Sequence, residues 1–159
     1  DESEWEQIIS PKYSPLAYID TTQGTIEIEL AVLDAPLTVA NFIRLARNNF
    51  FEGMAIYRAE DNFVLQSGDP REDGHGGPGY TIRDEINQRP FLRGTVGMSL
   101  NFEDSAGSQF FITHSPQPGF NGRYSAFGQV VNGIEVVDKI EPWDIIKQVR
   151  IWDGNRMWP

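Results

Sequence analysis

Apolar and polar positions alternate near the start of the chain in the pattern of two paired strands. An apolar stretch begins at residue 17, and residues 25–30 alternate so that Ile26, Ile28 and Leu30 share one face. Gln23-Gly24 lie between the two stretches, and a turn pair of this kind joins the strands of a hairpin. The pattern therefore predicts a β-hairpin with one buried face.

A helical period follows the hairpin. Apolar residues occupy positions i, i+3, i+4 and i+7, namely Val39, Phe42, Ile43 and Ala46. Asp34 is a favoured capping residue, Pro36 fits the first turn, and Asn48-Asn49 end the pattern. A second amphipathic helix is expected after Gly133, with inward-facing Val136, Val137 and Ile140.

The rest of the chain consists of short apolar runs separated by Gly-rich turns. Strands are expected near residues 54–58, 62–67, 95–99, 108–113, 124–131 and 147–152. The segment 68–79 is Gly-rich and charged, which is typical of a long surface loop. Many short strands with one early and one late helix predict a closed antiparallel barrel with helices over its ends.

Composition and charge narrow the function classes. The 159 residues fit one domain, and the formal net charge of −10 comes without any cluster of Lys and Arg. Binding to nucleic acid is therefore not expected, and neither is attraction to an anionic membrane surface. No apolar run approaches the roughly 18 residues of a membrane-spanning helix, so membrane insertion is not expected either. The acidity favours a soluble monomer.

The residue types that carry metal and hydrolase chemistry are sparse. There is no cysteine, and the two histidines, His75 and His114, are far apart in the sequence. No carboxylate spacing suggests a metal site, and the Gly-rich segment 74–79 lacks the Lys-Ser/Thr pair of a phosphate-binding loop. Serine and histidine occur without a nucleophile elbow. No cofactor or metal is expected.

Several polar and aromatic residues are candidates for a binding site. Arg58 lies between apolar residues in a strand context, where a structural salt bridge and a functional role are equally compatible with the local pattern. Phe110 and Phe111 are adjacent on a strand, so one ring faces the core and the other faces a groove, solvent or another layer. Phe120 and Tyr124 belong to a loop, and loops carry functional residues disproportionately.

Eight segments, taken in order, resemble the cyclophilin family of peptidyl-prolyl cis-trans isomerases, in a bacterial-like and divergent form. They are TTQGTIEIEL, APLTVANFIRLARNNFFEGMAIYR, FVLQSGDP, GGPGYTIRDE, RGTVGMS, GSQFFIT, FNGRYSAFGQVV and GIEVVDKI. The resemblance implies a mainly β fold, a closed eight-stranded antiparallel β-barrel capped by two α-helices. It implies a cyclophilin-like domain over residues 16–154, after a lead-in or linker at 1–15 and before a tail at 155–159.

The resemblance also implies roles for individual residues. Arg58 matches the catalytic arginine, which would donate a hydrogen bond to the prolyl nitrogen during rotation about the Xaa-Pro bond. Gln66 matches the glutamine that binds the substrate backbone. The substrate-binding positions as a whole are Phe63, Val64, Gln66, Ser99, Leu100, Gln109, Phe111, Phe120 and Tyr124. The implied partners are proline-containing peptides and unfolded or partly folded proteins.

Three departures from the family pattern affect these expectations. Val64 replaces the usual Met, Ser99-Leu100-Asn101 replaces Ala-Asn-Ala, and Gly119 stands where well-known members carry a Trp that contacts cyclosporin. Because Gly119 replaces that Trp, weak or no cyclosporin binding is expected. A non-catalytic scaffold that binds proline peptides, or a chaperone module of the same fold, is the alternative function. The acidic lead-in and the absence of an initiator Met slightly favour an exported location.

Overall fold

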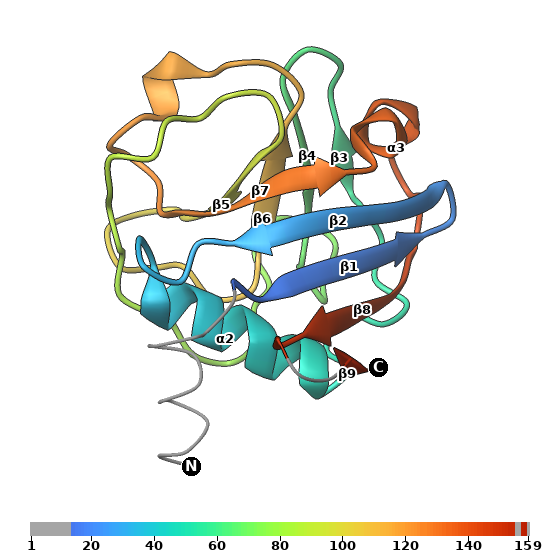
Figure 1. The fold of residues 1–159 in the computed structure, drawn as a ribbon, viewed down its shortest axis with the longest axis horizontal. Helices are drawn as coiled ribbons and strands as arrows, with labels where there is room; N and C mark the ends of the chain where they lie inside the picture. Colours follow the sequence, from blue (N-terminus) through green and yellow to red (C-terminus); the bar gives the residue numbers. More distant parts are fainter. Residues whose placement is uncertain (1–13, 155–156, 159) are drawn as a thin grey trace.

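One antiparallel sheet holds all the strands of the part of the chain that the structure describes, residues 14–154 and 157–158 of this computed structural model (Figure 1). Its strands are β1 Leu16–Thr21, β2 Gly24–Leu30, β3 Arg58–Ala59, β4 Val64–Ser67, β5 Thr95–Met98, β6 Phe110–Thr113, β7 Ala126–Asn132, β8 Ile146–Trp152 and β9 Met157–Trp158. The helices are α2 Pro36–Arg47, α3 Ile134–Lys139 and the short 3₁₀ helix η1 Pro118–Phe120.

The sheet curls into a half-barrel whose two sides meet through a short bridge. The strand order is β3-β4-β6-β5-β7-β2-β1-β8-β9. The segment before β3 reaches the start of β8, where Ala55 and Ile145 form an isolated bridge. There the Ile56 N–H donates to the Asp144 carbonyl at 2.7 Å, and the Ile146 N–H donates to the Met54 carbonyl at 2.8 Å. The predicted mainly β, antiparallel fold with two α-helices is confirmed, although the barrel is closed by this bridge and not by a full strand ladder.

The strands lie close to the positions that the sequence predicts. The predicted hairpin is β1 and β2, in which Thr21 pairs with Gly24 across the turn. Gly24 has a φ of +133°, a backbone conformation that suits glycine. The shared face of Ile26, Ile28 and Leu30 is buried, as expected. The predicted lead-in lies outside the described residues except at 14 and 15, and β9 lies within the predicted tail.

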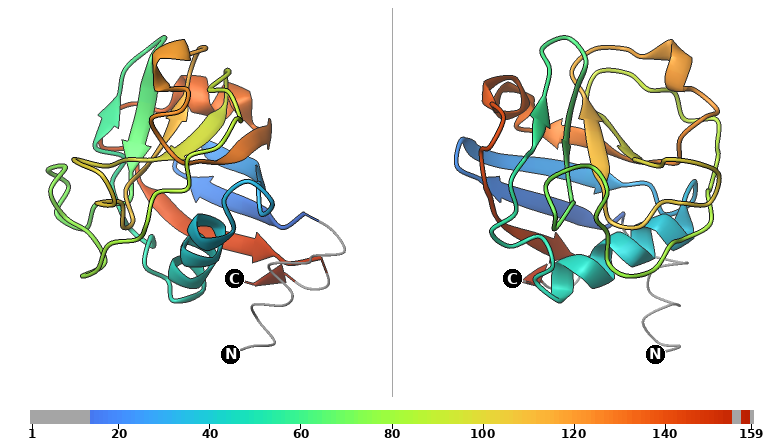
Figure 2. Two further views of the ribbon diagram at one scale, coloured as in Figure 1. Left: turned by 90° about the vertical axis from the view of Figure 1, so that its left-hand side faces the viewer. Right: turned by 180° about the vertical axis from the view of Figure 1, so that it is seen from behind.

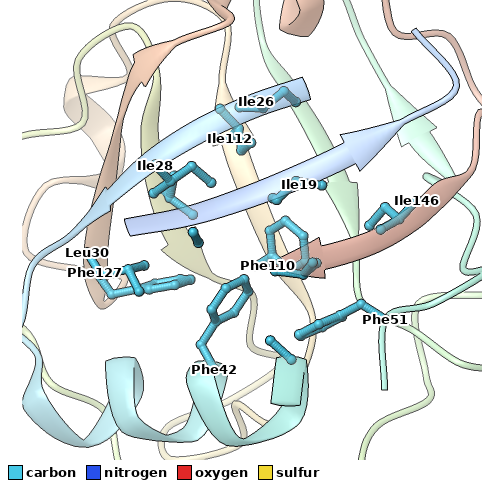
Figure 3. Packing of buried hydrophobic residues seen from close by; sticks show 14 of the residues in the cluster. Ile19, Ile26, Ile28, Leu30, Phe42, Phe51, Phe110, Ile112, Phe127 and Ile146 are labelled. Atoms are coloured by element: carbon cyan, nitrogen blue, oxygen red, sulfur yellow. The ribbon is translucent and has the colours of Figure 1, made fainter. Parts of the chain in front are cut away.

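The core fills the space between the curled sheet and α2. Figures 1 and 2 show α2 across one end of the barrel and α3 near the other end. Phe42 of α2 projects into the barrel, and its ring centroid lies 5.6 Å from that of Phe110 and 5.4 Å from that of Phe127 (Figure 3). These rings are almost fully buried among the strand isoleucines. Their burial contributes a large share of the apolar stabilisation.

The N-terminus of α2 is capped by a residue distant in sequence and not by Asp34. The residue before the helix is Ala35, which makes no side-chain capping bond, and the Asp34 carboxylate instead forms an ion pair with Arg89 at 2.9 Å. The Glu85 carboxylate accepts hydrogen bonds from the Thr38 N–H at 2.5 Å and from the Leu37 N–H at 3.2 Å. The expected Asp34 cap is therefore wrong. A carboxylate at this position also interacts favourably with the helix dipole.

We expect Glu85→Ala to lower the free energy of unfolding by about 1–2 kcal/mol, because it leaves the first N–H groups of α2 without their acceptor. Asp34→Ala should lower it by less than about 1 kcal/mol, because it removes only an exposed ion pair. Urea denaturation followed by circular dichroism measures both changes. A larger loss for Asp34→Ala than for Glu85→Ala would contradict this assignment of the cap.

Candidate active site

Arg58 lies at the surface beside an aromatic ring. Strand β3 pairs with β4 in a register that sets Arg58 opposite Gln66. The guanidinium carbon of Arg58 lies 5.2 Å from the centroid of the Phe63 ring, and its Nη2 contacts the Glu60 Oε2 at 3.1 Å. The Arg58 side chain is 41% exposed. The salt bridge that the local pattern allowed is present, and it lies at the surface, where an incoming peptide can reach the guanidinium.

A second apolar cluster, separate from the main core, lies next to Arg58. Its buried members are Val64, Phe91, Phe111 and Ala126, and its partly buried members are Phe63, Phe120 and Tyr124. We call this set the aromatic cluster. Ring centroids lie 5.7 Å apart for Phe63 and Phe120, and 5.1 Å apart for Phe120 and Tyr124, with the rings edge to face. The partly buried rings give the cluster an accessible apolar surface.

The two adjacent phenylalanines of β6 face different clusters, as the strand alternation predicts. Phe110 packs in the main core, whereas Phe111 stacks on Phe91 of the aromatic cluster with 5.5 Å between centroids. Gly97 of β5 pairs with Phe111, and a Cβ there would lie 2.7 Å from atoms of both rings. Glycine at this position therefore lets the two rings approach the sheet. Sequence reasoning missed Phe91, because its contact with Phe111 is not visible in any local pattern.

On the side of Arg58 away from the aromatic cluster, side-chain amides are linked to their neighbours by hydrogen bonds. The Gln66 Nε2 donates to the Ser99 Oγ at 2.6 Å, and the Gln109 Nε2 donates to the Gly76 carbonyl at 2.8 Å. The Tyr57 hydroxyl donates to the Gln109 Oε1 at 2.7 Å. Burial, together with the nearby Asp69 carboxylate, raises the pKa of Tyr57, so the phenol stays protonated as a donor. Tyr57 was also missed, because an inward tyrosine beside Arg58 is indistinguishable from a core residue in the sequence.

These side-chain amides form one wall of a cavity of about 380 Å³. The predicted residues Gln66, Ser99, Leu100 and Gln109 line it together with the loop residues 74–81. Gln66 faces both this cavity and Arg58, since it is paired with Arg58 in the sheet. The ten predicted site residues therefore lie in one continuous region: five belong to the aromatic cluster, four line the cavity, and Arg58 lies between the two sets, in contact with Phe63 and paired with Gln66.

A buried carboxylate holds the loop that covers the cavity. Asp69 is fully buried, and it accepts hydrogen bonds from the N–H groups of Arg71 at 2.8 Å, Asp73 at 2.9 Å and Gly74 at 2.5 Å. Burial alone would raise the pKa of Asp69, but these N–H bonds outweigh it and hold the pKa below its usual value. The ionised carboxylate therefore fixes the loop, and with it the Gly76 carbonyl that orients Gln109.

The described residues give little support to a metal site, to histidine chemistry or to a membrane-spanning helix. No group of three or more His, Asp or Glu within residues 14–154 and 157–158 is arranged to hold a metal ion. His75 is exposed, and His114 is buried with its Nε2 3.3 Å from the Val137 carbonyl. None of the helices described is long and apolar enough to span a bilayer.

Comparisons with known proteins identify the family. The model of the cyclophilin type peptidyl-prolyl cis-trans isomerases matches residues 16–154. The chain is 41% identical to a peptidyl-prolyl cis-trans isomerase of Synechococcus elongatus over 85% of this chain and 94% of that one. It is 43% identical to peptidyl-prolyl cis-trans isomerase B of Bacillus subtilis over 79% of this chain and 90% of the relative.

Solved structures agree with this assignment. The crystal structure of a Cryptosporidium parvum cyclophilin type isomerase superimposes with a TM-score of 0.84 at 29% identity, covering 88% of this chain and 98% of that one. A second structure of that protein, in the presence of the dipeptide Ala-Pro, gives a TM-score of 0.81. The chain belongs to the cyclophilin family, and the predicted peptidyl-prolyl cis-trans isomerase activity is confirmed at the level of the family.

We expect Asp69→Asn to lower the free energy of unfolding by about 1–3 kcal/mol at pH 7, because the amide cannot replace both carboxylate oxygens as acceptors for buried N–H groups. The folded-state pKa of Asp69 is depressed, so its contribution is complete above the unfolded value of 3.8 and is lost as the pH falls through the lower folded value. Urea denaturation from pH 7 to pH 3 should show the difference between the two proteins shrinking below about pH 4.

The control for this prediction is Glu72→Gln, which removes an exposed charge from the same loop and should leave stability within about 0.5 kcal/mol. A difference between Asp69→Asn and the native protein that stays constant down to pH 3 would contradict the role given to the ionised carboxylate.

Proposed function

We propose that Arg58 is the catalytic residue of this isomerase and that the aromatic cluster binds the proline ring. The observation that carries the proposal is the position of the Arg58 guanidinium, 5.2 Å from the centroid of the Phe63 ring at the edge of the aromatic cluster. A permanently charged donor thus stands beside an accessible apolar surface. Catalysis of rotation about an Xaa-Pro bond uses both features: the donor for the prolyl nitrogen and the apolar surface for the proline ring.

The chemistry follows from the electronic structure of the amide. Rotation about an Xaa-Pro bond crosses a barrier of about 18–20 kcal/mol, because it breaks the conjugation between the nitrogen lone pair and the carbonyl. In the twisted state the prolyl nitrogen becomes pyramidal and accepts a hydrogen bond. A donor from Arg58 stabilises that state more than either planar form, and this differential binding lowers the barrier. Arginine suits the role because it stays protonated and presents a rigid fork of donors.

The two ends of the rotating bond are held separately. Phe63, Val64, Phe111, Phe120 and Tyr124 hold the pyrrolidine ring by apolar contact. Gln66 and nearby backbone groups bind the carbonyl that precedes proline. The Gln66 Nε2 donates to the Ser99 Oγ at 2.6 Å and, over a longer distance of 3.5 Å, to the Gln109 Oε1, so the longer bond can give way to a peptide carbonyl. Holding both ends restricts the substrate to motion about the bond that must rotate.

The proposed substrates are proline-containing peptides and unfolded or partly folded proteins. The relative from Cryptosporidium parvum, solved in the presence of the dipeptide Ala-Pro, supports a dipeptide of this kind as the minimal ligand. The protein would act as a monomer and without a cofactor. An exported location stays a prediction that rests on the acidic composition of residues 1–15.

Arg58→Ala should lower kcat/KM for an Ala-Pro peptide at least tenfold, which corresponds to about 1.4 kcal/mol of transition-state stabilisation. Arg58→Lys keeps the charge but not the planar fork, so it should restore only part of the activity. Protease-free exchange spectroscopy by NMR measures the rates, and Lys147→Ala, which removes a surface cation from β8, is the control. Full activity in folded Arg58→Ala would contradict the mechanism. Peptide binding by the native protein without rate enhancement would instead support the scaffold function.

Gly119→Trp should raise the affinity for cyclosporin. Gly119 lies in η1, and a Cβ added there meets no atom within 4 Å, so the structure has room for the larger side chain. The native protein should bind cyclosporin weakly or not at all in calorimetric titration. An inhibition of the native enzyme as strong as that of the variant would show that the absent Trp does not limit cyclosporin binding.

A further inference from the structure

Glu60 places a carboxylate next to the catalytic arginine. It follows Arg58 by two residues on an extended segment, so both side chains point to the same face. The Glu60 Oε2 lies 3.1 Å from the Arg58 Nη2, and the Glu60 side chain is 54% exposed. The ion pair therefore forms part of the surface that a bound peptide would cross.

The backbone around Glu60 is fixed, so this carboxylate has a defined place. The Glu60 N–H donates to the Val64 carbonyl at 2.9 Å, and the Glu60 carbonyl accepts from the Phe63 N–H at 3.1 Å. The turn is tied to the residues after β6, because the His114 N–H donates to the Phe63 carbonyl at 2.8 Å and the Ser115 hydroxyl donates to the Asn62 carbonyl at 2.6 Å. Glu60 thus belongs to the same rigid frame as the aromatic cluster.

The sheet register gives the direction in which Glu60 lies. Arg58 is paired with Gln66, which faces the cavity, whereas Glu60 is hydrogen-bonded to Val64, which is two residues earlier on β4. Arg58 therefore lies beside Gln66 across the two strands, and Glu60 lies farther along the same face, opposite Val64 of the aromatic cluster and away from the cavity. A peptide whose residues before proline lie along Gln66 would continue past Arg58 toward Glu60 with the residues after proline. This step rests on the function proposed above for Gln66 and Arg58.

We propose that Glu60 is a specificity-determining residue that favours substrates with lysine or arginine after proline. A carboxylate has two oxygens with room for several donors, so it can accept from Arg58 and from a substrate cation together. An exposed pair such as Arg58–Glu60 contributes little to stability and opens readily. The following residue, Asp61, is also acidic and exposed, and the net charge of −10 favours the approach of cationic peptides.

The test compares peptides that differ in one charge. Two series carry Lys, Ala or Glu either directly after or directly before proline, and NMR exchange spectroscopy gives kcat/KM for each. The native protein should favour Lys over Ala after proline by about two- to fivefold and disfavour Glu by a similar factor, as expected for one exposed charge pair. In Glu60→Gln these ratios should fall to near one. They should also shrink in 0.5 M salt, where screening shortens the range of the charge.

Glu52→Gln is the matched control, because it removes an exposed carboxylate from the turn after α2, and it should keep the native ratios. Ratios that persist in Glu60→Gln, or a charge preference confined to the residue before proline, would overturn the inference. A native protein that isomerises the Ala peptide without any charge preference would overturn the inference alone. If the native protein isomerises none of the peptides, the proposed catalytic function fails, and the inference about Glu60 fails with it.

Discussion

The register of β4 between β3 and β6 is the constraint on which the site depends. Gln66 is paired with Arg58 on one side and with Phe111 on the other, so three residues from three strands stand in one row. Because side chains alternate along a strand, a slip of one residue would turn Arg58 or Phe111 to the opposite face. The main core prevents such a slip, since it would have to release Phe110, which packs against Phe42 and Phe51. The core thus sets the alignment of the proposed site residues, although it is a separate cluster from the one that they form.

The two sides of Arg58 differ in how they are built. The aromatic cluster is built mainly from rings packed against one another. Its shape depends on Gly97, because any larger residue there would displace Phe91 and Phe111. The cavity wall includes the side-chain amides of Gln66 and Gln109, and the orientation of Gln109 depends on Tyr57 and on the loop held by Asp69. Rings recognise proline by shape and apolar contact, whereas amides recognise a peptide backbone by hydrogen bonds. The division matches the needs of a substrate in which one end is held while the other rotates.

Local patterns predicted the elements of this fold well, and they failed where distant residues meet. The alternation of Ile26, Ile28 and Leu30 and the helical spacing of Phe42 and Ile43 each reflect burial of one face, which a short stretch of sequence records. The cap of α2 was misassigned because Asp34 is the nearest acidic residue, whereas Glu85 reaches the helix across the fold.

The candidate site shows the same limit. Arg58 was ambiguous by pattern, and only the resemblance of eight ordered segments gave it a role. Phe91 and Tyr57 were missed because their importance comes from contacts with Phe111 and Gln109, which no spacing reveals. Asp69 was passed over as part of a charged loop, although burial makes it the acceptor that orders that loop. Tertiary contacts of this kind can be read only from the folded chain.

The bridge between residues 53–56 and 143–146 has a consequence for how the chain folds during its synthesis on the ribosome. β1 pairs with β8, which is synthesised more than a hundred residues later. The segment that leads into Arg58 likewise pairs with residues 143–146, which are synthesised about ninety residues later. Synthesis at about 5–20 residues per second therefore leaves the early strands without their final neighbours for on the order of ten seconds. During that interval the barrel is not assembled, and the segment that leads into Arg58 lacks its bridge to Ile145. The barrel can therefore close only after residues 143–152 have been synthesised.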